Sequence, residues 1–188
     1  MVMKDIAKFL LEVGSLKNVR RSGWFVAGVK NPESISDHSM RAIITGYLIA
    51  KEERADEEKV MKMLMFHDVP ETRLGDMHKV TAKYIDKQKA EKNVVEDQSK
   101  MLSKEAGKEY IELMKELAEG RTKEAKIAID ADYLECAIQA HEYMENGYKN
   151  AREWIERVRA ELKTETAKQI LEEVVKSEFW WKGLKKMH

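Results

Sequence analysis

Apolar residues recur at helical spacing along most of this chain, and that periodicity constrains the fold more than any other feature. A clear example near the N-terminus consists of Ile6, Phe9, Leu10 and Val13. Residues spaced in this way share one face of a helix and give it a side that can be buried. No segment alternates apolar and polar residues as a half-buried strand would, and only two prolines occur. The sequence therefore predicts an all-α bundle.

Capping residues divide this bundle into helices. Ser34 and Asp37 supply the chemistry of a helix start. Gly120 and Gly147 fit helix ends, where glycine readily takes the left-handed conformation. Helices are expected at about 34–55, 56–67, 80–106 (one helix or a pair), 108–119, 122–146 and 164–182, with a long loop at 15–33. No repeat or Gly/Ser linker interrupts the 188 residues, so we expect one domain over 1–188.

Charge and cysteine content exclude several classes of protein. The 34 basic and 34 acidic residues cancel, which gives no electrostatic case for binding a nucleic-acid polymer or an anionic membrane. No run of 18 apolar residues is present, and Lys8 breaks the apolar N-terminal stretch, so neither a membrane span nor a signal peptide is predicted. The single Cys136 excludes an intrachain disulfide and suits a reducing compartment. We expect a cytoplasmic protein.

Histidines beside carboxylates are the features with chemical meaning. His38 lies in the run SDHS, and His67 and Asp68 lie in FHDV. Asp130 and Asp132 lie in IDADYLE, within an apolar, small-residue segment. Separate helices could bring two imidazoles and two carboxylates to one centre, a set that suits a divalent transition ion with room for water. Each residue alone is more often structural; the ordered combination favours a metal site.

Several motifs in this order resemble a known family. They are RSGW, NPESISDHS, MFHDVPET, LGD and DADYLECAIQAHEY. Together they resemble the HD-domain metal-dependent phosphohydrolases, and most of all the 5′-deoxynucleotidase branch (the HD-domain-containing protein 2 type). The resemblance runs from about Gly14 to Tyr143. It implies a single-domain HD-type helical bundle, with the metal-site core at about 14–143 and C-terminal helices at about 148–188 packing on it.

The resemblance also implies roles for individual residues. The family's metal ligands correspond to His38, His67, Asp68 and Asp132. Its catalytic glutamate corresponds to Glu71, four residues after His67, and its phosphate-orienting arginine to Arg21. Arg20 is adjacent, so the phosphate contact could fall on either arginine. The other substrate contacts correspond to Trp24, Asp76, Met77, His78 and Lys79.

Helical spacing separates the two aspartates of IDAD. Asp132 shares a row with the small residues Ala128 and Cys136, which leaves space for an ion and another helix. Asp130 follows Lys126 by four residues, which favours an exposed ion pair. We therefore predict that Asp132 is the ligand and that replacing Asp130 by alanine costs little.

The implied function is hydrolysis of the 5′-phosphate of (deoxy)nucleoside monophosphates by water activated on one divalent ion: manganese, cobalt, nickel, iron or zinc. A homodimer is also expected. Two alternatives stay open: an HD hydrolase of a cyclic or polyphosphorylated nucleotide, and a helical binding module that a metal only stabilises. The run HDVPE lacks the Gly and Lys of the cyclic-dinucleotide type, and the binding module leaves Arg21 and Glu71 without a role.

Overall fold

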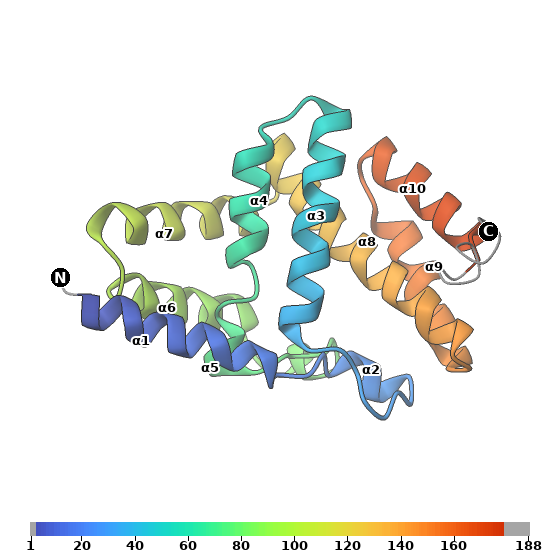
Figure 1. Cartoon of the computed structure of the whole chain (residues 1–188), viewed down its shortest axis with the longest axis horizontal. Helices are drawn as coiled ribbons and strands as arrows, with labels where there is room; N and C mark the ends of the chain where they lie inside the picture. The colour runs from blue at the N-terminus through green and yellow to red at the C-terminus, as the bar shows by residue number, and fades with distance from the viewer. Residues whose placement is uncertain (1–2, 179–188) are drawn as a thin grey trace, which may run out of the picture.

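The computed structural model describes residues 3–178, and its regular structure there is helical (Figure 1). The α-helices are α1 (Met3–Gly14), α2 (Gly23–Val26), α3 (Ile35–Glu53), α4 (Glu57–Phe66), α5 (Glu71–Leu74), α6 (Lys87–Ser99), α7 (Lys104–Glu119), α8 (Lys123–Glu145), α9 (Arg152–Glu161) and α10 (Glu165–Lys176). Short 3-10 helices are η1 (Ser15–Lys17), η2 (Thr81–Lys83) and η3 (Lys149–Ala151). The predicted all-α, single-domain fold is confirmed. Within the described range, no helix is long and apolar enough to cross a membrane.

Local caps explain where α3 and α4 begin. The Ser34 hydroxyl accepts a hydrogen bond from the backbone N–H of Asp37, and the Asp37 carboxylate accepts one from the backbone N–H of Ser34. This reciprocal pair is a capping box, as the sequence predicts. Asp56 caps α4 by accepting a hydrogen bond from the backbone N–H of Lys59 at 3.0 Å. These caps set the start of the two helices that bring the histidines to the site.

Helix α8 lies at the centre of the bundle and packs against α3, α4, α7, α9 and α10. Small side chains on its buried face, such as Ala128 and Ala131, let neighbouring helices come close. Gly46 on α3 serves the same purpose, because a Cβ there would lie only 2.2 Å from the Leu64 side chain of α4. Close approach of these three helices therefore depends on small residues at the contacts.

Some segments differ from the prediction. The expected loop at 15–33 contains η1 and α2. The helix expected from residue 80 begins at Lys87 instead. Asp86 is its N-cap and accepts a hydrogen bond from the backbone N–H of Lys89. Helix α9 is not among the individually predicted helices. It lies in the C-terminal region, at about 148–188, that is expected to pack on the core. The last residues of the helix predicted at 164–182 lie outside the described residues.

Asp130 is fully buried, which shows that its predicted exposed position was wrong. Its carboxylate accepts hydrogen bonds from the backbone N–H groups of Lys163 and Thr164, at 3.0 and 2.6 Å, and from the Thr164 hydroxyl at 2.7 Å. Thr164 is the N-cap of α10, so Asp130 ties the start of α10 to the central helix. Spacing from Lys126 misled the prediction, because the segment that covers this face comes 33 residues later in the chain.

We therefore expect Asp130→Ala to lower the free energy of unfolding by roughly 2–4 kcal/mol, since it removes a buried side chain and the acceptor of two backbone N–H groups at the start of α10. Denaturant titration of the purified protein measures the loss. Asp97→Ala is the control, because Asp97 is an exposed aspartate that pairs with the cations of Arg73 and Lys100 at the surface. Equal shifts in the two variants would contradict the anchoring role of Asp130.

Candidate metal centre and nucleotide cavity

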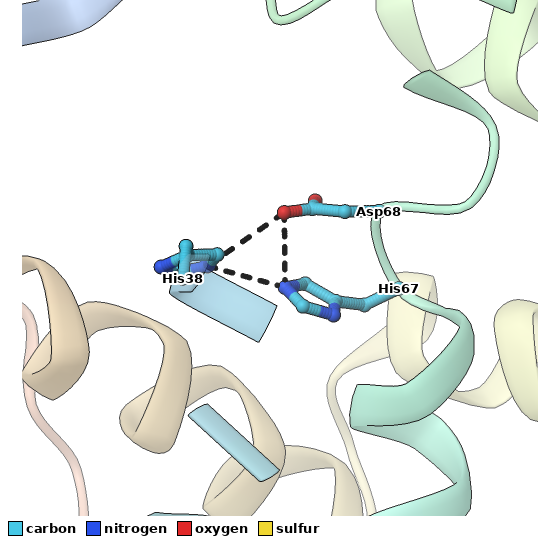
Figure 2. Close-up of side chains that lie close together, drawn as sticks. All are labelled: His38, His67 and Asp68. Atoms are coloured by element: carbon cyan, nitrogen blue, oxygen red, sulfur yellow. Dashed lines mark hydrogen bonds and ion pairs between the residues drawn. The ribbon is translucent and has the colours of Figure 1, made fainter. Parts of the chain in front are cut away.

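The four predicted ligand side chains meet where α3, the end of α4 and α8 come together. His38 Nε2 lies 3.3 Å from His67 Nε2 and 3.0 Å from Asp132 Oδ1. Asp68 Oδ2 lies 3.6 Å from His38 Nε2 and 3.2 Å from His67 Nε2. Figure 2 shows His38 of α3 pointing toward His67 and Asp68, which are adjacent residues just after the end of α4. Atoms that each lie about 2.1 Å from one ion are about 3–3.5 Å apart. The separations among His38, His67 and Asp68 are close to this range, and Asp132 adjoins that cluster through His38.

In each histidine, Nε2 faces the centre, and a contact between Nδ1 and an oxygen atom fixes the orientation of the ring. His67 Nδ1 lies 2.6 Å from the backbone oxygen of Leu64, and His38 Nδ1 bonds the carboxylate of Glu135. An N–H at Nδ1 that donates to these oxygens leaves the Nε2 lone pair directed at the centre. Oxygen partners of this kind are typical of histidines that bind metals. The rings are therefore held in the orientation that coordination requires.

Glu135 is a fully buried carboxylate that sequence reasoning missed. Its second oxygen accepts a hydrogen bond from Arg41 Nε at 2.9 Å, and Arg41 also donates to Gln139 and Glu142. Burial alone would raise the pKa of Glu135, but His38 and Arg41 hold that pKa below its usual value. A carboxylate three residues after Asp132 in an apolar helix was the available signal for this residue.

We expect Glu135→Gln to weaken metal binding by about 10–100-fold, the usual effect of losing an outer partner of a ligand histidine. Gln keeps the shape but loses the charge that stabilises His38. Competition with a chelator measures the affinity directly. Glu142→Gln is the matched control, because Glu142 contacts Arg41 but not His38. An unchanged affinity in Glu135→Gln would refute the positioning role of this carboxylate.

Arg21 reaches the centre, and Arg20 does not. The Arg21 guanidinium lies 3.5 Å from Asp68 Oδ2 and donates to Cys136 Sγ at 2.7 Å. Arg20 is exposed and donates to the backbone oxygen of Pro32 instead. Burial alone would raise the pKa of Asp68, but His67, His38 and Arg21 hold that pKa well below its usual range. Arg21 thus presents a planar cation at the edge of the cavity, beside the predicted ligands.

Glu71 begins α5 and does not lie on a continuation of α4. Helix α4 ends at Phe66, and a turn through Pro70 separates the two helices. The Glu71 side chain is buried; its Oε1 lies 3.7 Å from Lys87 Nζ, and its Oε2 has no hydrogen-bond partner among the described residues. Burial, together with the charges of Asp68 and Asp76, raises the pKa of Glu71 to about 10. This environment therefore favours the neutral form of the Glu71 carboxyl.

A cavity of about 500 Å³ opens beside the centre, a size that fits a small ligand such as a nucleotide. The sequence-predicted residues among its lining are Arg21, Trp24, Asp68, Glu71, Asp76, Met77, His78, Lys79 and Asp132. All predicted substrate contacts therefore border one space. Lys87 and Cys136 also line it and were not predicted as site residues.

Two of the predicted contacts are held by other parts of the protein. Trp24 is only 1% exposed; its indole N–H donates to Glu33 at 3.0 Å, and its ring packs on Trp154. Trp24 therefore forms part of the cavity wall and offers no free face. Asp76 Oδ2 accepts hydrogen bonds from the hydroxyl of Ser22, at 2.6 Å, and from its backbone N–H, which leaves Oδ1 for another donor.

Helix α9 contributes part of the wall of the cavity. Trp154, Arg157 and Glu161, spaced at three and four residues, all line it. Burial and the charge of Arg157 lower the pKa of Lys79, another lining residue, whose ammonium lies 6.0 Å from the centre of the Tyr133 ring. These α9 residues belong to no recognisable motif, so the sequence offered no signal for them.

Comparisons with known proteins agree with this geometry. The HD domain family matches residues 13–175 of the chain. The 5′-deoxynucleotidase HDDC2 of Dictyostelium discoideum is 35% identical over 151 residues, which cover 75% of this chain and 78% of that protein. The human protein of the same name is 31% identical over 152 residues, covering 79% and 73%. A conserved hypothetical protein from Pyrococcus furiosus superposes with a TM-score of 0.76 at 33% identity, covering 91% of this chain and 99% of that one.

Proposed function

Since this chain belongs to the HD domain family, we propose that it is a metal-dependent phosphohydrolase that removes the 5′-phosphate from nucleoside monophosphates and prefers the deoxy forms. One observation carries the proposal. Asp68 and Asp132 of the candidate centre, the guanidinium of Arg21 and the buried carboxyl of Glu71 all border one cavity of about 500 Å³. The names of the curated relatives support the same reaction.

The donor set fits a divalent metal ion. Two imidazole nitrogens and two carboxylate oxygens would hold it, from His38, His67, Asp68 and Asp132. The negative charges of the two carboxylates favour a cation. Manganese, cobalt, nickel, iron and zinc all accept such ligands. When bound, the ion supplies a source of hydroxide near neutral pH and polarises a phosphate oxygen. One ion per chain is proposed.

The chain's own residues bind the substrate and move the proton. The planar fork of Arg21 donates two hydrogen bonds to the phosphate and offsets its charge. Glu71 donates the proton it holds to the 5′-oxygen as the phosphorus–oxygen bond breaks, so the nucleoside leaves as an alcohol. The free oxygen of Asp76 accepts a hydrogen bond from a sugar hydroxyl, and Trp24 limits the space beside the sugar. Met77, His78 and Lys79 border the remainder of the nucleotide.

The proposal extends to the chain's surroundings. A nucleoside 5′-monophosphate is the substrate. Two copies of the chain form a homodimer. The single Cys136, half-buried and without a disulfide partner, suits the reducing conditions of the cytoplasm. We therefore place the enzyme there.

A screen of phosphate release over deoxy- and ribonucleoside monophosphates, each with several added divalent ions, tests the reaction. We expect metal-dependent release of inorganic phosphate from the monophosphates, faster for the deoxy forms. Release of pyrophosphate or triphosphate, or cleavage of a cyclic nucleotide, would favour the alternative substrates. A rise in melting temperature with metal but no turnover on any nucleotide would favour a binding module.

A further inference from the structure

Helix α3 exposes a stripe of large apolar side chains that the proposed chemistry does not use. The stripe consists of Met40, Ile44, Tyr47 and Leu48, whose exposed fractions are 62, 48, 37 and 52%. Their spacing of three and four residues places them on one face, opposite the buried His38. Figure 1 shows α3 crossing in front of α8, against which its buried face packs. A continuous apolar stripe on a surface helix indicates a contact surface.

Three residues of this stripe are spaced symmetrically about Ile44, whereas the counterpart of Tyr47 is Arg41. Met40 lies four residues before Ile44 and Leu48 four residues after it. Exposed residues of opposite charge end the stripe, with Asp37 seven residues before Ile44 and Lys51 seven residues after it. Met40, Ile44 and Leu48 are therefore complementary to an antiparallel copy of themselves, and the charges at the two ends are of opposite sign. Within the chain Lys51 pairs with Glu57, and the Asp37 carboxylate accepts hydrogen bonds from Ser34.

We propose that α3 is the homodimer interface, with the α3 helices of two chains packed antiparallel about a two-fold axis at Ile44. This inference rests on the homodimer of the proposed function and names its surface. Met40 then contacts the partner subunit's Leu48, and Asp37 faces the partner subunit's Lys51. A parallel arrangement would place Asp37 beside the partner's Asp37 and Lys51 beside the partner's Lys51, and both like-charge contacts oppose it. A two-fold arrangement also leaves both metal centres on the buried sides of the α3 pair.

Engineered cysteines test both the surface and the direction of the helices. Across the proposed axis, Met40 and the partner's Met40 are eight residues apart, about 12 Å along the helix. That separation exceeds the roughly 7 Å between Cα atoms that a disulfide can span. Met40→Cys and Leu48→Cys chains, mixed and oxidised, should form a disulfide-linked dimer, and Met40→Cys alone should not. Ile44→Cys should link to itself, because it lies on the axis.

Wild-type protein controls for the native Cys136, and Leu11→Cys controls for an exposed apolar residue on another helix, since Leu11 of α1 is 80% exposed. A parallel pair would link Met40→Cys to itself, and an interface elsewhere would link none of the α3 variants. Either result would overturn the proposal.

Light scattering and phosphate release separate this inference from the proposed function. Ile44→Glu, or Leu48→Glu as a second variant, should weaken dimerisation about 100-fold or more, since each substitution acts twice across the axis. Circular dichroism verifies that these exposed substitutions leave the fold intact. Both variants should keep metal content and turnover, because the stripe lies away from the cavity. A variant that stays dimeric like the wild type refutes the α3 interface and leaves the phosphatase proposal standing. Loss of turnover in every protein, with dimers intact, would refute the phosphatase alone.

Discussion

Replacing Asp132 by alanine is expected to remove bound metal and nearly all phosphate release. Asp132 is the ligand proposed from α8, and its Oδ1 lies 3.0 Å from His38 Nε2. Without it, the centre keeps two imidazoles and only one carboxylate. The affinity loss should exceed the roughly 10–100-fold typical of outer partners such as Glu135. Since a catalytic metal supplies several kcal/mol of transition-state stabilisation, turnover should fall by about 10³-fold or more.

Metal analysis of the purified protein, followed by turnover with added ion, measures both effects. Glu124→Ala is the matched control, because it removes one carboxylate from the same helix α8 away from the cavity. Asp130→Ala cannot serve as the control, since Asp130 anchors α10. One ion per chain in Asp132→Ala, at wild-type affinity, would remove Asp132 from the proposed ligand set.

The second large effect is expected at Glu71. Glu71→Gln keeps the size and hydrogen-bonding shape of the side chain but cannot transfer a proton. Proton transfer by a positioned side chain typically contributes about 10²–10⁴-fold, so turnover should fall by that factor. The metal content should stay at the wild-type level, because Glu71 lies outside the proposed ligand set. Steady-state kinetics and metal analysis on the same sample distinguish this loss from that of Asp132→Ala.

Glu91→Gln is the matched control for Glu71. Both carboxylates lie near the Lys87 ammonium, at 3.7 Å for Glu71 and 3.2 Å for Glu91, but Glu91 does not line the cavity. Replacing Glu91 therefore changes the charge near Lys87 without touching the proposed proton donor. The same loss of turnover in both variants would mean that Glu71 acts only through Lys87. Full activity in Glu71→Gln would refute the proton-transfer role.

The sequence by itself determined the features of this protein that depend on neighbouring residues. Helix type follows from periodicity, and the starts of α3 and α4 follow from caps made within three residues. The candidate metal ligands were also accessible, because each lies in a short motif and the order of the motifs carries the resemblance. The structure places His38, His67 and Asp68 close together, with Asp132 beside His38.

Tertiary structure alone decided what depends on contacts between distant segments. Arg21 rather than Arg20 faces the centre because Arg21 meets Asp68 and Cys136, which lie 47 and 115 residues away. Glu135 orients His38 from a position 97 residues along the chain. Asp130 is buried by a segment 33 residues later, where helical spacing alone indicated an exposed site. Spacing reports which residues share a face of a helix; whether that face meets solvent, another helix or a cavity is set by the packing of the whole chain.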